Sequence, residues 1–206
     1  MSATVALENY KGIFAGGYIK QVGSSLQVCL ETNNLQLLSV NLEDRERYVE
    51  LYSDPETAIW ADREARTSMT DTATSVDVWI QRWKEGIPFS SFAIYHRQNS
   101  DFVGHIMVDT GNGPGQCKMV CAISNKHEEF ASEAIDIILT EWLPYLHQRG
   151  YHIANDRGIS KVVSVITAIS YADHAGSNHI WVKNGFTKTE KKVGGSCSHT
   201  TYEKHL

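Results

Sequence analysis

Residues 117–146 read CKMVCAISNKHEEFASEAIDIILTEWLPYL. We predict a strand over Cys117–Ser124, a short turn over Asn125–Glu129 and a long helix that begins near Phe130. After that start, apolar residues recur at helical spacing and mark one buried face; they are Ala131, Ala134, Ile135, Ile138, Trp142 and Leu146. A strand that leads straight into a helix leaves backbone N–H groups exposed at the helix start, where the helix dipole also favours an anion. The segment therefore predicts a place where a phosphate group binds.

The composition fits a single globular domain with a sizeable core, since the chain has 206 residues of which 42% are hydrophobic. A net charge of −5 gives no reason to expect sequence-independent binding of nucleic acid. No apolar run approaches the roughly 20 residues of a membrane span, and the N-terminus lacks the apolar core of a signal peptide. We therefore expect neither a nucleic-acid nor a membrane partner.

The cysteines are interpreted as small core residues. The four, Cys29, Cys117, Cys121 and Cys197, do not form the framework of a secreted disulfide-rich protein, so a reducing cytoplasmic location is expected. Cys117 and Cys121 share one face of their strand, but no second ligand pair at zinc spacing accompanies them. No metal site is predicted.

The N-terminal part of the chain is the hardest to interpret. We treat residues 1–29 as an extension and residues 30–206 as the domain. Within the extension, Tyr18–Val22 has the pattern of a strand, and the remainder either packs on the domain or is partly disordered. Leu35–Val40 alternates sufficiently to be the first strand of the domain.

Four helix boundaries can be predicted from local chemistry. Asn41 caps the first helix with Asp44 as its reciprocal partner, and Pro55 ends that helix. Ser75 is expected to cap the second helix. In the third helix, Pro144 removes a backbone donor and crowds the preceding turn, so the helix should kink or end there.

Further strands follow from turn chemistry and β-branched residues. Ser91–His96 and Phe102–Asp109 form a hairpin. Lys161–Ile169 is β-branched and is predicted to be a buried strand. Phe186–Val193 and Ser196–Tyr202 form a closing hairpin across a glycine pair.

Two segments resemble one protein family. The helix start Phe130-Ala131-Ser132-Glu133-Ala134 resembles the acetyl-CoA-binding segment of the GNAT N-acetyltransferases, in particular the branch that acetylates ribosomal-protein N-termini. There, an Arg/Gln-x-x-Gly-x-Gly/Ala turn precedes a Tyr/Phe-Ala-Ser/Thr-Glu-Ala helix start. Asp173–Phe186 resembles the second family pattern, Asn-x-x-Ser-x-x-Val-x-x-Lys-x-Gly-Phe. Ser177, Lys183, Gly185 and Phe186 match it in register, and His174 stands at the Asn position.

The turn before the helix departs from the family. Where the family has Arg-Gly-x-Gly, this chain has Lys126-His127-Glu128-Glu129. The basic residue is kept as Lys126, but both glycines are replaced, one of them by a carboxylate.

The resemblance implies a fold and an activity. The fold is an α/β (α+β) arrangement, with a mixed, mostly antiparallel sheet of six or seven strands opened near its middle and helices on both faces. In it, Cys117–Ser124 and Lys161–Ile169 are neighbouring strands. The activity is acetyl-CoA-dependent transfer of an acetyl group to a primary amine by direct attack in a ternary complex. The acceptor is a small molecule or a peptide or protein N-terminus, and the protein is a monomer or homodimer. The alternative is a catalytically impaired GNAT-fold binding or regulatory protein with weak or no acetyl-CoA binding.

The resemblance also implies roles for individual residues. Ser177 protonates or hydrogen-bonds the leaving sulfur, unless it only caps its helix. His174 lies three residues earlier on the same face and either transfers a proton or is an incidental surface histidine. Amides of the central strand polarise the thioester carbonyl, and amides of the turn hold the pyrophosphate. The implied cofactor-binding residues are Val120, Cys121, Ala122, Ile123, Lys126, His127, Glu128, Glu129, Phe130, Ala131, Ser132, Ser177 and Lys183.

The general base is not specified by the family pattern. Relatives often place a Glu on the central strand, but this chain has Cys117-Lys118-Met119 in that region. Asp109, His105 and Glu64 are the remaining candidates. The polar segment Glu56–Thr74 either is a solvated helix or loop, or forms a wall of the acceptor site, as the resemblance implies.

Overall fold

The computed structural model describes residues 10–11, 14–55, 57, 69–194 and 197–206. The strands are β1 (Tyr10–Lys11), β2 (Gly17–Val22), β3 (Ser25–Glu31), β4 (Leu35–Ser39), β5 (Ser91–His96), β6 (Phe102–Thr110), β7 (Gln116–Ile123), β8 (His152–Ala154), β9 (Ser160–Val162), β10 (Val165–Tyr171), β11 (Thr187–Gly194) and β12 (Cys197–His205). The helices are α1 (Arg45–Ser53), α3 (Met69–Lys84), α4 (Ala131–Ile137), α5 (Leu143–Gln148) and α6 (Ala175–Lys183).

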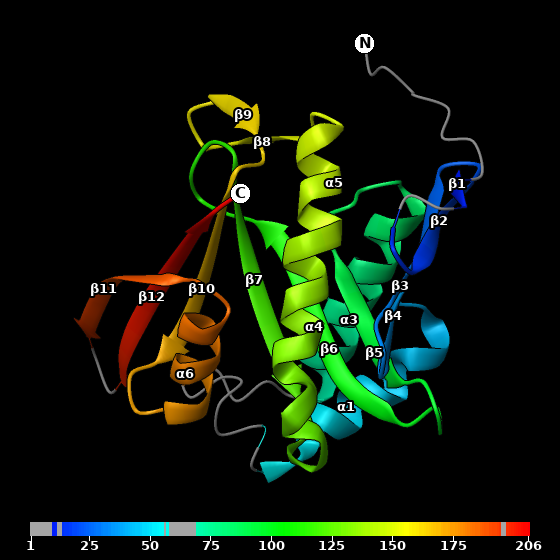
Figure 1. The fold of residues 1–206 in the computed structure, drawn as a ribbon, viewed down its shortest axis with the longest axis horizontal. Coiled ribbons are helices and arrows are strands. Elements are labelled where there is room, and N and C mark those ends of the chain that lie inside the picture. The colour runs from blue at the N-terminus through cyan, green and yellow to red at the C-terminus, as the bar shows by residue number, and fades with distance from the viewer. Residues whose placement is uncertain (1–9, 12–13, 56, 58–68, 195–196) are drawn as a thin grey trace.

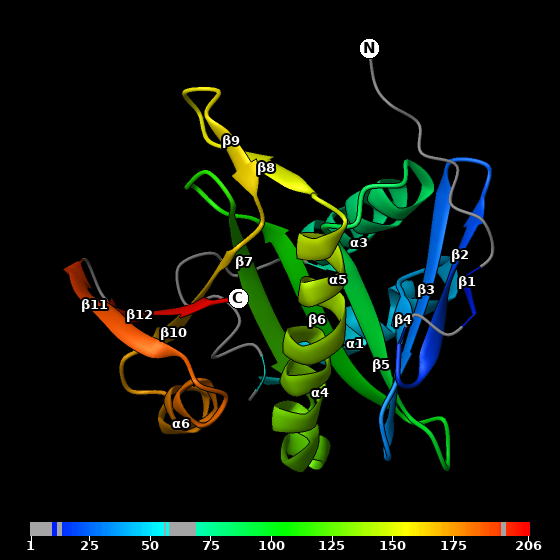
Figure 2. The same cartoon turned by 45° about the horizontal axis from the view of Figure 1, so that its top comes forward.

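Within the described residues, ten strands form one sheet in the order β1-β2-β3-β4-β5-β6-β7-β10-β12-β11. Only β7 and β10 pair in parallel there, and every other neighbouring pair is antiparallel. Helices α4, α5 and α6 lie in front of the sheet and α1 and α3 behind it (Figure 1). The tilted view in Figure 2 shows the same two layers of helices. The predicted mixed, mostly antiparallel sheet with helices on both faces is confirmed.

The number of strands exceeds the expected six or seven because the N-terminal residues join the sheet. In the order of the sheet, the seven strands from β4 to β11 agree with the expectation. Strands β1, β2 and β3 are added at the open edge of β4. Strand β2 confirms the strand predicted at Tyr18–Val22. Its hairpin with β3 turns at Gly23, which has φ +62°. Phe14, just before β2, packs its ring 5.8 Å from that of Tyr145 in α5, so this region contributes to the core.

The helical segment after β7 confirms the predicted buried face. Ala134, Ile135, Ile138, Trp142 and Leu146 are each at most 1% exposed. Of the two outcomes expected at Pro144, a kink or an end, the end is wrong, because the helix continues through this residue (Figure 1). A π-helical turn over Ile138–Trp142 precedes α5, and Pro144 lies in the first turn of α5. The wider π-helical turn just before Pro144 leaves room for the proline ring and changes the hydrogen-bond pattern there, which allows the helix to continue.

The predicted cap at Asn41 is confirmed on the 3₁₀ turn Leu42–Asp44 that leads into α1, whereas α3 begins earlier than expected. The Asp44 carboxylate accepts a hydrogen bond from the N–H of Asn41 at 2.8 Å, and Asn41 accepts one from Glu43 at 2.7 Å. Helix α3 begins at Met69, so the prediction of Ser75 as its cap is wrong. Thr72 is only 4% exposed and lies four residues before the buried Val76, so the core-facing stripe begins at a polar residue.

The predicted strand over Lys161–Ile169 is divided in two. Its first part, β9, pairs with β8 in a separate two-stranded sheet, and its second part is β10. Strand β10 lies beside β7, which confirms that these two strands are neighbours. The parallel ladder covers only the four pairs from Val165–Gln116 to Ala168–Met119, and beyond it the strands separate. The sheet is therefore open near its middle. No helix in the described part of the chain is long and apolar enough to span a membrane.

Candidate active site

A cavity of about 710 Å³ lies where β7 and β10 separate. Sites for small molecules typically have volumes of roughly 300–1,000 Å³. Tyr52 from α1 and Thr57 after it line one side. Ala131 and Ile135 from α4 and Ser177 from α6 line another. Because these helices lie on opposite faces of the sheet, the cavity passes through the opening between the strands.

Strand β7 presents backbone hydrogen-bonding groups to this cavity. Its pairing with β10 ends at Met119, whereas its pairing with β6 continues to Ile123. Since antiparallel pairing occupies the main-chain groups of alternate residues, the other residues of this segment direct theirs toward the opening. Val120, Cys121, Ala122 and Ile123, all predicted as cofactor-binding, line the cavity. Such groups can hold an amide-containing chain and donate to a carbonyl oxygen.

Ser177 and His174 both line the cavity, and the structure distinguishes their local roles. His174 is the N-cap of α6, because its Nδ1 accepts a hydrogen bond from the backbone N–H of Ser177 at 3.3 Å. The alternative that Ser177 caps the helix is therefore wrong. Its hydroxyl makes no hydrogen bond to any described residue. Gly185, with φ +80°, ends the helix as predicted.

The turn before α4 places only part of its side chains at the cavity. Residues Asn125–Phe130 form a 3₁₀ turn that His127 interrupts, with φ −136° and ψ 20°. Glu128 lines the cavity, whereas Lys126 and Glu129 are exposed outside the lining. An anion in this part of the cavity therefore has a carboxylate beside it.

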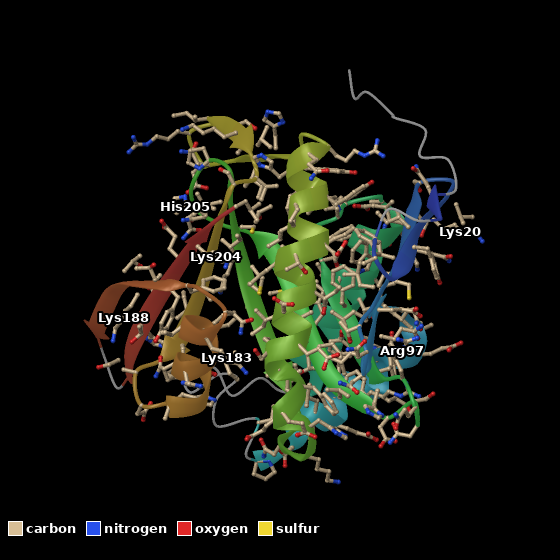
Figure 3. The ribbon with its side chains drawn as sticks, viewed as in Figure 1. Lys20, Arg97, Lys183, Lys188, Lys204 and His205 are labelled. Carbon is tan, nitrogen blue, oxygen red and sulfur yellow. The ribbon has the colours of Figure 1, made fainter. Side chains whose placement is uncertain are left out.

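Several predicted cofactor-binding residues lie outside the cavity lining. They are Lys126, His127, Glu129, Phe130, Ser132 and Lys183. Ser132 instead connects two helices, since its Oγ accepts a hydrogen bond from Asn184 at 3.2 Å. Lys183, labelled in Figure 3, is an exposed residue at the C-terminal end of α6.

Of the candidates for a general base, neither Asp109 nor His105 lines the cavity. Asp109 is paired with Arg82 at 2.8 Å. Glu64 lies outside the described residues. His105 is fully buried, and burial lowers the pKa of its ring to about 3. The imidazole is therefore neutral at ordinary pH.

Tyr52 connects His105 to the cavity, and sequence reasoning did not identify it as a site residue. Its hydroxyl lies 2.6 Å from Nε2 of His105. Burial raises the pKa of Tyr52 above its usual range, so the hydroxyl keeps its proton. Its position on the apolar side of α1 was visible in the sequence, but a tyrosine there is commonly only a core residue.

The cysteines near the site are thiols. Burial raises the pKa values of Cys117 and Cys121 to about 12, so neither is a thiolate nucleophile at neutral pH. Among the described residues, no group of three or more His, Cys, Asp or Glu side chains is arranged to hold a metal ion.

Comparisons with known proteins agree with this architecture. The family model of the acetyltransferase (GNAT) domain matches residues 34–187. No curated protein matches the chain.

Solved structures of acetyltransferases share the fold. A GNAT-family acetyltransferase from Bacillus anthracis has a TM-score of 0.65 and 16% identity, covering 86% of this chain and 98% of its own. RimL, a ribosomal-protein alpha-N acetyltransferase solved with coenzyme A, has a TM-score of 0.65 and 12% identity, covering 86% and 98%. A ribosomal-protein-alanine acetyltransferase from Vibrio fischeri has a TM-score of 0.67 and 10% identity, covering 86% and 96%. At these identities the similarity shows a common fold.

Proposed function

Because the chain belongs to the GNAT acetyltransferase family, we propose that it transfers the acetyl group of acetyl-CoA to a primary amine. The acceptor is a small molecule or a peptide or protein N-terminus, and the amine attacks directly in a ternary complex. The observation that carries the proposal is the opening between β7 and β10, where strand amides and Ser177 border one cavity. The names of RimL and of the Vibrio fischeri enzyme indicate ribosomal-protein acceptors, which supports a peptidic amine.

The cavity suits the thioester end of acetyl-CoA better than its phosphates. Groups of Val120–Ile123 would hold the pantetheine arm, and the hydroxyl of Ser177 is available to the sulfur. Lys126 and the amides before Ser132 would meet the pyrophosphate. The carboxylate of Glu128 borders that end and opposes a second anion.

The reaction needs an uncharged amine, hydrogen-bond donors for the carbonyl oxygen and a proton for the leaving sulfur. Acetyl-CoA supplies a thioester whose carbonyl carbon bonds to the amine nitrogen while the carbon–sulfur bond breaks. The β7 amides donate hydrogen bonds to the carbonyl oxygen as it becomes negative. Ser177 donates its hydroxyl proton to the leaving sulfur, and the proton that the amine nitrogen loses as the amide forms returns to Ser177. Since Asp109 is paired with Arg82, the proposal uses an amine that enters the cavity uncharged.

Replacement of Ser177 tests this mechanism. Ser177→Ala should lower kcat by roughly 100-fold, typical of lost proton donation, and change acetyl-CoA affinity much less, because the thiolate develops only in the transition state. Ser160→Ala in the exposed strand β9 is the matched control. Steady-state kinetics with N-terminal peptides and small amines provide both constants. An unchanged kcat would remove Ser177 from the mechanism.

A second function is a GNAT-fold binding or regulatory protein with weak or no acetyl-CoA binding. The position of Glu128 at the cavity favours it. Calorimetry and a thermal shift at millimolar acetyl-CoA decide between the two. If acetyl-CoA produced no heat of binding and no change in melting temperature, the non-catalytic protein would be favoured.

The proposal includes the cellular location, the domain bounds and the oligomeric state of the protein. Cys29, Cys117 and Cys121 are free thiols, which supports a reducing cytoplasm. We assign the acyltransferase domain to residues 30–206, acting as a monomer or homodimer.

A further inference from the structure

A row of four polar side chains, each within hydrogen-bond distance of the next, leads from the core to the cavity. Tyr48 and Ser91 lie with Oη and Oγ 3.0 Å apart, and Ser91 Oγ lies 3.1 Å from Nδ1 of His105. Nε2 of His105 lies 2.6 Å from Oη of Tyr52, which lines the cavity. Tyr48, Ser91 and His105 are each 0% exposed. The first three groups therefore have to satisfy one another without water.

The number of protons available determines which group is the donor and which the acceptor in each of these hydrogen bonds. Among the described residues, the hydroxyl of Tyr48 has one hydrogen-bond partner, Ser91. A buried hydroxyl without an acceptor for its proton is costly, so Tyr48 donates to Ser91. Ser91 has one hydroxyl proton, and the remaining partner in reach is Nδ1 of His105. Ser91 therefore donates to Nδ1, and that nitrogen carries no proton.

The tautomer of His105 follows from this direction. The rings of Tyr48, Tyr52 and Trp79 surround the imidazole, with centroids 4.8, 5.6 and 5.4 Å away. Burial among aromatic rings keeps the imidazole neutral, so its one proton is on Nε2. Nε2–H donates to Tyr52, whose own proton is then left for an acceptor in the cavity.

We propose that His105 acts as a positioning residue that directs the hydroxyl proton of Tyr52 into the cavity, where it binds an oxygen of the acceptor substrate next to its amine. Tyr52 belongs to α1, on the face of the sheet opposite α4 and α6 (Figure 1). Those two helices border the end assigned to acetyl-CoA, so Tyr52 serves the acceptor end. The amine lone pair is used in the attack, which leaves an adjacent carbonyl or hydroxyl oxygen as the group that Tyr52 binds. This inference rests on the proposed function and narrows its substrate to amines with a neighbouring oxygen, such as an amino-acid amide or a peptide N-terminus.

The proton direction can be measured in the free protein. Nitrogen-15 chemical shifts distinguish a protonated from an unprotonated ring nitrogen, and loss of the signals in His105→Gln assigns them. We expect a single tautomer with the proton on Nε2. Tyr48→Phe removes the donor that fixes Ser91, so both tautomers should become populated. A proton on Nδ1 in the unaltered protein would overturn the inference.

Acceptor selection is tested with a matched pair of probes, L-alaninamide and isopropylamine, which differ by the carboxamide next to the amine. Because a neighbouring carboxamide lowers the pKa of the amine, each affinity is expressed for the uncharged form of the probe. On that basis calorimetry should show that the unaltered protein binds L-alaninamide about fivefold more tightly, the factor that corresponds to one net hydrogen bond. Tyr52→Phe should abolish this preference. Tyr18→Phe, at an exposed tyrosine of β2, is the matched control and should retain it.

The outcomes separate this inference from the proposed function. No binding of L-alaninamide, no preference for it, or a preference that survives Tyr52→Phe would overturn the role of Tyr52. Failure of the proposed function has a different result, in which the preference is present but added acetyl-CoA produces no acetylated amine.

Discussion

The cavity is bordered by two polar regions that are built in opposite ways. In the first, which we call the α1 wall, Tyr48, Ser91 and His105 are completely buried behind Tyr52 and are bonded to one another. In the second, the Asn125–Phe130 turn, the charged side chains are exposed to water. Buried polar groups depend on their partners, because the protein interior offers no replacement. Exposed charges are solvated and mainly affect what binds near them.

Of the substitutions predicted here, one in the backbone beside His105 should lower the free energy of unfolding the most. Gly104 has φ +151°, and a Cβ there would overlap the carbonyl oxygen of Ala122 on β7. Gly104→Ala should lower the free energy of unfolding by about 3–5 kcal/mol, from backbone strain and the clash. Gly158→Ala is the control, because Gly158 also has positive φ but open space around it, and about 1 kcal/mol is expected. Denaturant titration measures both, and equal effects would contradict the close packing of β6 on β7.

Two histidine substitutions compare the α1 wall and the turn directly. His105→Leu removes a partner from both Ser91 and Tyr52 and should cost about 1–3 kcal/mol. His127→Leu, in the turn, makes the same chemical change at a half-buried side chain and should stay within about 0.5 kcal/mol. Chemical denaturation of both variants provides the comparison. If His127→Leu were the more destabilising, the contrast between the two regions would be wrong.

The pKa of His105 predicts a pH dependence of stability. Its pKa is about 3 in the folded protein and 6.5 ordinarily. Between these values the unfolded chain binds the proton and the folded protein does not, so stability falls as the pH falls, by at most about 1.4 kcal/mol per pH unit. The stability difference between the unaltered protein and His105→Leu should therefore narrow from about pH 7 to about pH 4. A constant difference would show that His105 does not titrate in this way.

The carboxylates of the turn should have small effects on stability and opposite effects on binding. Carboxylates at a helix N-terminus contribute about 0.3–1 kcal/mol each. Glu129→Gly, alone or with Glu128→Gly, should lower the melting temperature slightly and tighten acetyl-CoA binding, because like-charge repulsion is removed and the backbone can approach the phosphates.

Charge and backbone effects at the turn are separated by glutamine variants. Glu128 lines the cavity and Glu129 does not, so Glu128→Gln should tighten acetyl-CoA binding more than Glu129→Gln. The gain should shrink with added salt, since exposed charges are screened. Calorimetry at low and high salt tests this. Binding that is no tighter at low salt would mean that the carboxylates point away from the phosphates.

The sequence by itself determined the elements whose signals are local. The buried face of α4 follows from the spacing of Ala134, Ile138 and Trp142, and the cap of the first helical segment follows from Asn41 and Asp44. Such periodicities and caps depend on neighbours within a few residues, so they can be recognised without the fold. The mostly antiparallel sheet that opens near its middle, and the neighbouring positions of β7 and β10, came from the family resemblance.

Only the tertiary structure decided the features that depend on distant partners. Helix α3 begins before Ser75, because the polar side chain of Thr72 is buried in the core. Strands β1–β3 join the sheet because the edge of β4 is open to them. The α1 wall is the clearest case, since Tyr52 and His105 are 53 residues apart and Tyr48 and Ser91 are 43 apart. Each is an ordinary residue in its own segment. Their common role arises because folding removes them from water together, and buried hydrogen-bonding groups must then find partners wherever the chain brings them.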